Sequence, residues 1–143
     1  MIFDNNSFTS TGQTVTINVA ATCNNMNWSG ALYTPTLAGT LNLTIYGSLT
    51  FIADMSLTFS GNVYFSSLST GQTITTANKT FKNNVYFDNI GEWILQDSLK
   101  LTTAGKYIYF NNGTLNTNGK AVITPMFRSN VTTTRTLNLG SSV

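Results

Sequence analysis

A segment of alternating apolar and polar residues recurs along the chain at a regular interval. Residues 58–65, Thr-Phe-Ser-Gly-Asn-Val-Tyr-Phe, return at 80–87 as Thr-Phe-Lys-Asn-Asn-Val-Tyr-Phe. Stepping by the same interval in both directions aligns one threonine in each of six repeats, at Thr14, Thr36, Thr58, Thr80, Thr102 and Thr124. Three positions later lies a column of turn-forming residues, Gly39, Gly61, Asn83 and Gly105. A short period of this kind is typical of solenoid proteins.

Within each repeat, apolar residues form groups whose members are separated by one residue. Side chains of a strand point alternately to its two faces, so each group predicts a short strand with its apolar residues inward. The first group contains Val19 and Ala21, Leu41 and Leu43, Val63 and Phe65, Val85 and Phe87, and Tyr107 and Tyr109. The second contains Leu49 and Phe51, Trp93 and Leu95, Leu115 and Thr117, and Leu137 and Leu139. The third contains Met55, Leu57 and Phe59, then Leu99, Leu101 and Thr103, then Ala121 and Ile123.

These groups predict an all-β fold, a right-handed parallel β-helix (solenoid) of about six 22-residue coils with three short strands each. One coil cannot bury its own apolar side chains, whereas stacked coils share a core and pair their backbones. We therefore expect a single β-solenoid domain over residues 1–143, with an irregular first coil at residues 1–13. That the chain is a fragment of a longer solenoid stays open as an alternative.

The repeat is imperfect at several places. In the coil that starts at Thr58, the apolar residue of the second strand, Ile74, has slipped by one position. Trp28 lies one position off the column of Trp93. These slips predict turns of changed length. Proline removes a backbone donor, so Pro35 and Pro125 are expected at strand ends.

Composition supports a β-rich fold with many tight turns. Only 8% of residues are charged, and polarity comes instead from 25 Thr, 18 Asn and 13 Ser. Thr favours strands and Asn favours turns. Low charge with these residue types is typical of secreted and virion proteins, so we expect an extracellular or virion location.

Several functional classes are disfavoured by what the sequence lacks. It contains no His and a single Cys, Cys23, so the commonest general base and a thiol–imidazole pair are missing. A net charge of +2 without a basic run disfavours nucleic acid as a partner. We also expect no signal peptide, no membrane span, no metal site and no cofactor.

Three of the five acidic residues, Asp88, Glu92 and Asp97, fall in one coil. Paired carboxylates about 5–10 Å apart on one face would be typical of a polysaccharide-degrading β-helix enzyme. The alternative is that these carboxylates cap turns, which acidic residues at corners commonly do. We favour turn capping and expect no catalytic residue.

An outward column of large side chains is the candidate ligand-binding site. The repeat places Tyr64, Tyr86 and Ile108 above one another, with Asn42 below. Rings stacked at the strand spacing of about 4.8 Å could bind a sugar or a partner surface. The alternative is an aromatic ladder that only stabilises the sheet.

The ends of a solenoid present unpaired strand edges, which invite further pairing. We therefore expect a homo-oligomer, or neighbouring structural subunits, held through open solenoid ends. Cell-surface polysaccharide is a further candidate partner.

Residues 91–99, Gly-Glu-Trp-Ile-Leu-Gln-Asp-Ser-Leu, resemble a coil of Asn/Thr-rich parallel β-helix repeat domains. Residues 114–120 and 134–140 are similar to the coils that follow it in such domains. These repeats occur in bacterial surface or secreted proteins and in phage tail or fibre proteins. The resemblance implies a stalk, adhesin or receptor-contact role and supplies no catalytic residues.

We therefore expect a non-enzymatic structural or adhesive module of a virion (tail fibre, spike or surface decoration) or of a bacterial surface protein. The alternative is a carbohydrate-binding or polysaccharide-degrading β-helix.

Overall fold

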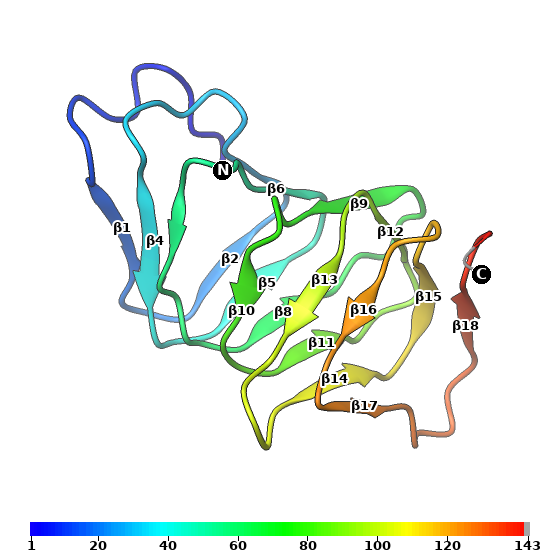
Figure 1. Ribbon diagram of the computed structural model, residues 1–143. Coiled ribbons are helices and arrows are strands. Elements are labelled where there is room, and N and C mark those ends of the chain that lie inside the picture. Colours follow the sequence, from blue (N-terminus) through cyan, green and yellow to red (C-terminus); the bar gives the residue numbers. More distant parts are fainter. Residues whose placement is uncertain (142–143) are drawn as a thin grey trace.

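The computed structural model describes residues 1–141, in which 18 short strands pair in parallel with strands of neighbouring coils. Three strands make one coil, so the chain forms the six coils that its repeat predicts. Figure 1 shows the coils stacked from β1 at one end to β18 at the other. At a strand spacing of about 4.8 Å the stack is roughly 29 Å long. The described residues contain no helix, and hence none long and apolar enough to cross a membrane.

Each coil contributes one strand to each of three faces. The tyrosine face, named for the column described below, contains β2 (Ala21–Cys23), β5 (Leu43–Ile45), β8 (Val63–Phe65), β11 (Val85–Phe87), β14 (Tyr107–Phe110) and β17 (Met126–Arg128). The second face contains β3 (Met26–Asn27), β6 (Leu49–Thr50), β9 (Gln72–Thr75), β12 (Glu92–Leu95), β15 (Gly113–Asn116) and β18 (Arg135–Asn138). The split face contains β1 (Thr14–Ile17), β4 (Thr36–Gly39) and β7 (Ser56–Leu57), then β10 (Thr80–Phe81), β13 (Leu99–Leu101) and β16 (Val122–Ile123).

The split face consists of two three-stranded sheets, so the solenoid has four parallel sheets in all. The break lies between β7 and β10, where the turn before β10 has positive φ at Ala77 and Asn78. The Lys79 ammonium group crosses the break and donates a hydrogen bond of 2.6 Å to the Ala53 carbonyl oxygen. A side chain therefore joins the turns that precede β7 and β10, where the strand ladder stops.

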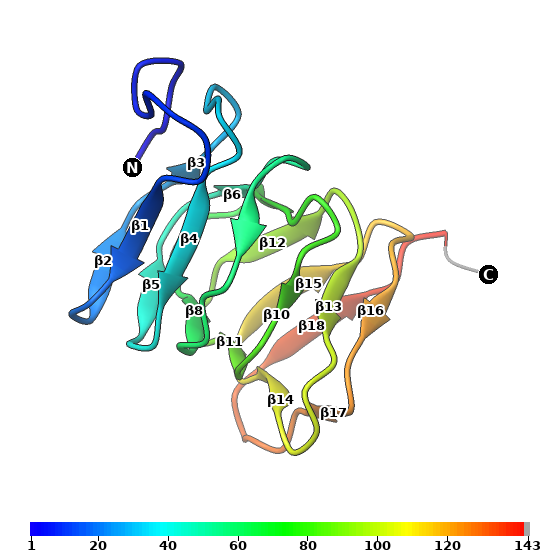
Figure 2. The same cartoon turned by 60° about the vertical axis from the view of Figure 1, so that its left-hand side comes forward.

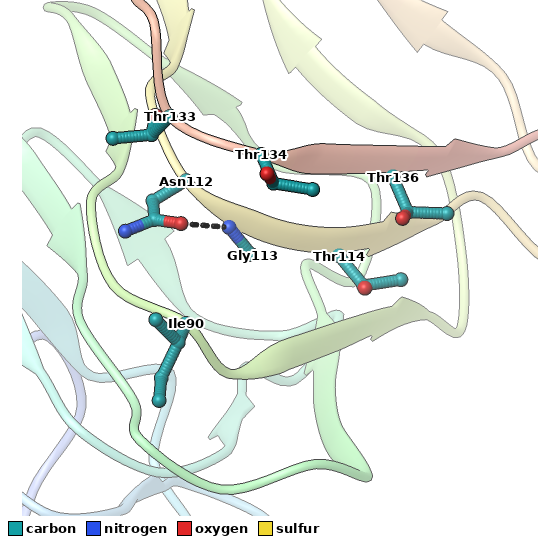
Figure 3. A pocket seen from close by; sticks show the side chains of 7 residues that line it. All are labelled: Ile90, Asn112, Gly113, Thr114, Thr133, Thr134 and Thr136. Carbon is teal, nitrogen blue, oxygen red and sulfur yellow. Dashed lines mark hydrogen bonds between the residues drawn. The ribbon is translucent and has the colours of Figure 1, made fainter.

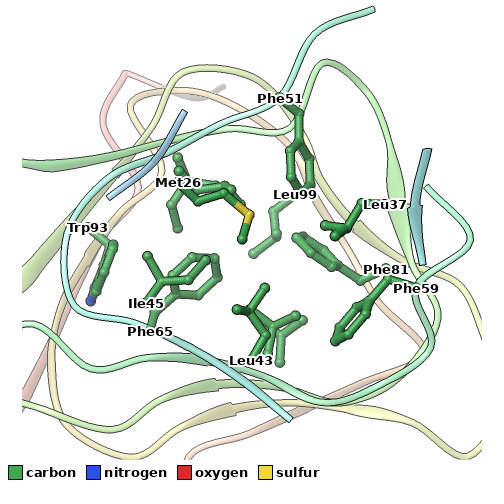
Figure 4. Close-up of a cluster of buried hydrophobic side chains, with 14 of the residues drawn as sticks. Met26, Leu37, Leu43, Ile45, Phe51, Phe59, Phe65, Phe81, Trp93 and Leu99 are labelled. Atoms are coloured by element: carbon green, nitrogen blue, oxygen red, sulfur yellow. The ribbon is translucent and has the colours of Figure 1, made fainter. Parts of the chain in front are cut away.

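The core is one continuous apolar column that runs along the inside of the coils. Residues of all three faces point toward the axis, as Figure 4 shows for Leu43, Trp93 and Leu37. Alternation along the strands produces this, because every second residue faces inward. Each fully buried aliphatic or aromatic side chain contributes about 1.5–3 kcal/mol. The core therefore depends on neighbouring coils, as expected for a solenoid.

The interval between paired residues varies from coil to coil. The first inward residues of the strands on the tyrosine face pair in the order Ala21, Leu43, Val63, Val85, Ile108 and Phe127. The interval is longest between Val85 and Ile108 and shortest between Ile108 and Phe127. Turns of different length between the strands produce this variation.

The threonine column predicted from an even repeat is therefore wrong beyond its first pair. Thr14 pairs with Thr36, as predicted. Thr36 then pairs with Ser56 instead of Thr58, and Thr80 pairs with Lys100 instead of Thr102. The split face thus carries no continuous row of threonines.

The uneven interval also corrects several predicted inward residues. Val19 and Leu41 are 67% and 44% exposed at a corner, and the buried pair on β5 is Leu43 and Ile45. On β14 the inward residues are Ile108 and Phe110, not Tyr107 and Tyr109. In the last coil Val122, rather than Ala121 or Ile123, pairs with Leu99. When a turn gains or loses one residue, the residues of the following strand that faced the core face outward, and the outward residues face the core.

The irregularities at Ile74 and at the two prolines are accommodated in the turns. Ile74 is fully buried and pairs with Leu49 of the preceding coil and with Leu95 of the following coil. Both prolines lie outside strands, since Pro35 precedes β4 and Pro125 precedes β17. The slips seen in the sequence thus leave the core continuous.

Residues 1–13 form a cap at one corner instead of a regular coil. Ile2 makes a single parallel bridge to Asn27. The rings of Phe3 and Phe8 stack on Trp28, with centroids 3.8 Å and 5.8 Å away. Figure 2 shows this segment rising beside β3, while β1 and β2 form the near end of the stack. The cap buries Phe8 and Trp28. Among the strands of residues 1–141, β2 pairs with β5 alone.

Candidate functional site: the tyrosine column

Three tyrosines form a stack on the exterior of the tyrosine face. Tyr64 of β8, Tyr86 of β11 and Tyr109 of β14 occupy paired positions between two inward residues of their strands. Neighbouring ring centroids are 4.4 Å and 4.6 Å apart, and the ring planes differ by only 7° and 4°. The strand spacing of about 4.8 Å sets this separation. The rings therefore lie face to face along the solenoid axis.

Ile108 does not belong to this column, which corrects the prediction from the sequence. Its side chain is fully buried, because Ile108 takes the inward place beside Val85 where an even repeat would put Tyr107. Tyr109 takes the outward position instead. The residues of β14, Tyr-Ile-Tyr-Phe, are apolar or aromatic at both parities, so the alternation alone could not choose between them. The predicted placement of Tyr64 and Tyr86 as outward neighbours is confirmed.

Polar and cationic groups hold the stack at its end and side. The Arg128 guanidinium lies over the Tyr109 ring, 5.9 Å from its centroid, which is within the range of a cation–π contact. The Asn84 amide donates a 3.3 Å hydrogen bond to the Tyr86 hydroxyl and accepts one of 2.9 Å from the Tyr107 N–H. Burial raises the pKa of the Tyr86 hydroxyl, and the hydrogen bond from Asn84 opposes this shift.

Stacking limits what the column can bind. A sugar usually packs an apolar face on an aromatic face, but here the ring faces contact each other and Arg128. Ring edges and hydroxyl groups remain for a ligand, together with the Tyr64 face directed toward Thr44. This geometry favours the stabilising ladder over a sugar platform, and ligand binding at the column stays a prediction.

We expect Tyr86→Ala to lower the free energy of unfolding by about 1–3 kcal/mol, because the central ring loses two stacked neighbours. Tyr46→Ala is the matched control. Tyr46 is 48% exposed on the same side and makes no ring contact among the described residues. Tyr46→Ala should therefore lower the free energy of unfolding by no more than about 0.5 kcal/mol. Urea unfolding followed by circular dichroism measures both values. Equal losses for the two variants would show that the stack does not stabilise the sheet.

The three acidic residues of one coil each accept hydrogen bonds from a neighbouring coil. Asp97 Oδ1 accepts from the backbone N–H and the hydroxyl of Thr76, both at 2.8 Å. Glu92 accepts from the Gly71 N–H at 3.2 Å, and Asp88 accepts from the Asn111 amide at 2.7 Å. These contacts match the turn-capping interpretation. Within residues 1–141, no group of three or more Cys, Asp or Glu side chains is placed to hold a metal ion.

A shallow depression on the second face was not foreseen from the sequence. It has a volume of about 400 Å³ and lies where β15 and β18 begin. Its lining combines threonine hydroxyl groups with one apolar side chain, as Figure 3 shows: Ile90, Asn112, Gly113, Thr114, Thr133, Thr134 and Thr136. Asn112 accepts a 2.8 Å hydrogen bond from the Gly113 N–H within this lining. The run Thr132–Thr134 was the one local signal, and it is weak in a chain with 25 Thr.

Comparison of the chain with protein-family models, with curated proteins and with solved structures gave no match.

Proposed function

We propose that this chain is a non-enzymatic structural or adhesive β-solenoid module of a virion, as in a tail fibre, spike or surface decoration, or of a bacterial surface protein. The observation that carries the proposal is that side chains outside the core contact neighbouring coils of the same chain. The tyrosine rings stack on each other, and three of the five acidic side chains cap neighbouring coils. Side chains committed in this way stiffen a scaffold and leave little for catalysis. The resemblance to Asn/Thr-rich repeats of surface and phage fibre proteins points the same way.

An extracellular or virion location follows from this proposal and can be tested directly. An antibody raised against the folded chain should label virions, or the outer surface of intact cells, of the source organism. Labelling that requires permeabilised cells and stays in the cytoplasm would contradict the proposal.

A second candidate function is binding of neutral carbohydrate, and the threonine-lined depression favours it. Sugars present hydroxyl groups beside apolar C–H patches. The depression offers the hydroxyls of Thr114 and Thr136 near the Ile90 side chain, which is 64% exposed. It contains no charged side chain, so a neutral glycan fits it better than an acidic one.

A panel of neutral and acidic polysaccharides separates these functions. We expect no release of reducing ends from any of them, since the three carboxylates that share one coil are engaged in capping. If the depression binds glycan, the chain is retained by a neutral polysaccharide, and the double variant Thr114→Val, Thr136→Val weakens binding about tenfold through two lost hydrogen bonds. Thr50→Val, on the same face in β6, is the matched control. Tyr64→Ala and Tyr86→Ala test the column in the same way.

Each outcome of the panel bears on one function. If the chain releases reducing ends and Glu92→Gln abolishes this release, the chain is an enzyme and the leading proposal is overturned. Retention that depends on the tyrosines but not on the threonines would move the binding site to the tyrosine column. The absence of any retention would remove the carbohydrate-binding candidate.

A further inference from the structure

Charge is segregated along the solenoid. Residues 1–78 contain two acidic and no basic side chains, for a side-chain charge of −2, whereas residues 98–143 contain five basic and no acidic side chains, for +5. Each coil advances along the axis, so the last two coils are basic, whereas the first three carry Asp4, in the cap, and Asp54, in the turn before β7. We call the end with Asp4 the acidic end after its side chain; the Met1 ammonium group also lies there and donates a hydrogen bond to the Asn25 carbonyl oxygen. The five cations lie around the solenoid rather than on one face: Lys100 of β13, Lys106 before β14, Lys120 before β16, Arg128 of β17 and Arg135 of β18.

At the acidic end, β2 has an open edge. The Ala21 N–H donates to the Asn42 carbonyl, and the Cys23 carbonyl accepts from the Tyr46 N–H, each at 2.9 Å. Both inward residues of β2 therefore bond to the next coil. In a parallel ladder, alternate residues direct their backbone groups to opposite sides, so those of Thr22 point away from β5. Within residues 1–141 no strand pairs with β2 on that side.

At the basic end, β17 has the complementary open edge. Inward residues of this face bond toward the following coil, as the 2.9 Å bond from the Asn111 N–H to the Phe87 carbonyl shows. Phe127 holds the inward position of β17 because it pairs with Ile108. Its N–H and carbonyl therefore point away from β14, where no described strand follows. The open groups of Phe127 and of Thr22 face opposite ends of the same face.

The basic end also exposes the end of the core. A depression of about 230 Å³ there is lined mainly by apolar side chains: Thr117, Val122, Thr124, Phe127, Leu137 and Leu139. Phe127 and Leu137 are 40% and 46% exposed, although their positions in earlier coils are buried. At the other end, Ala21 and Cys23 are only half-buried on β2. An apolar centre within a polar rim is the usual composition of a protein interface.

We propose that a second copy of this chain docks on this end, head to tail, with its β2 pairing in parallel with β17. The inference rests on the structural role proposed above and names the partner in it. Two basic ends repel each other, whereas the other end carries the Asp4 carboxylate and no basic side chain. Only the head-to-tail arrangement offers parallel strands of the same face. The contact is heterologous, so it repeats and lengthens the solenoid.

Proline at the two open edges tests this arrangement, because proline removes the edge N–H without breaking the inner ladder. We expect the unaltered chain to associate with rising concentration in sedimentation velocity, about tenfold more weakly in ~0.5 M than in ~0.05 M salt. Thr22→Pro and Phe127→Pro should each be monomeric alone. Their mixture should form a dimer and nothing larger, since each retains one intact end. The controls Thr22→Ala and Phe127→Leu keep the N–H and should associate normally.

Each other outcome overturns the arrangement. An unaltered chain that stays monomeric at every concentration excludes self-docking. Association lost in Phe127→Pro but kept in Thr22→Pro would mean that two basic ends meet, and association kept in both would place the contact elsewhere. Should a proline variant fail to fold, the exposed Lys120→Glu must weaken association at the lower salt concentration. The location and polysaccharide tests do not depend on oligomeric state, so they judge the proposed function separately.

Discussion

Replacing Trp93 with alanine is expected to lower the free energy of unfolding by about 3–5 kcal/mol, the usual loss for a large aromatic side chain removed from a core. Trp93 of β12 is 1% exposed. Its ring lies 4.8 Å from that of Phe65 and 6.4 Å from that of Phe87, centroid to centroid. The alanine variant would therefore leave a cavity between the second face and the Phe65 and Phe87 rings of the tyrosine face. Urea unfolding followed by far-ultraviolet circular dichroism, which does not depend on tryptophan fluorescence, measures the loss.

Two further variants give this prediction its controls. The buried Trp93 Nε1–H has no hydrogen-bond partner among the described residues, so Trp93→Phe removes a desolvated donor as well as some volume. We expect it to cost about 1 kcal/mol, well below the alanine variant. Leu68→Ala changes a side chain that is 70% exposed and should stay within about 0.5 kcal/mol. A Trp93→Ala loss near that of Leu68→Ala would contradict the packing of the core.

Gly39→Ala is expected to cost about 2–4 kcal/mol, because the position combines backbone strain with steric overlap. Gly39 ends β4 with a φ of +120°, which residues with a Cβ rarely adopt. A Cβ there would also overlap the Ile17 carbonyl oxygen and lie 2.8 Å from the Ile17 nitrogen. Ile17 and Gly39 are register partners, so the substitution would separate β1 from β4. Thermal unfolding by calorimetry measures the effect.

Gly12→Ala separates the two contributions. Gly12 has a φ of +77°, but a Cβ there would meet no atom within 4 Å. Gly12→Ala should therefore lower the free energy of unfolding by about 1 kcal/mol, through backbone conformation alone. If Gly39→Ala lowers the free energy of unfolding no more than Gly12→Ala does, β1 and β4 do not approach each other closely at Gly39.

The candidate sites followed from the sequence only in part. Tyr64 and Tyr86 could be placed together because the segment around Tyr64 returns almost unchanged around Tyr86, one repeat later. Capping by Asp97 could be expected as a type of contact, but not its partner Thr76, which lies in another coil. The threonine-lined depression joins residues of three coils, from Ile90 to Thr136, and no local pattern marks it.

The sequence by itself determined the class of fold. Alternation within short segments specifies strands, and a short regular period specifies stacked coils, since a single coil cannot bury its apolar side chains. Both signals are local or strictly periodic, so they can be read without knowing which residues touch.

Tertiary structure alone determined which residues meet between coils. Turn lengths change the interval between partners on the tyrosine face, which is longest from Val85 to Ile108 and shortest from Ile108 to Phe127, and these changes carry no local signal. The residues of β14 are apolar or aromatic at both parities, so packing of Ile108 beside Val85 was needed to bring Tyr109 into the column.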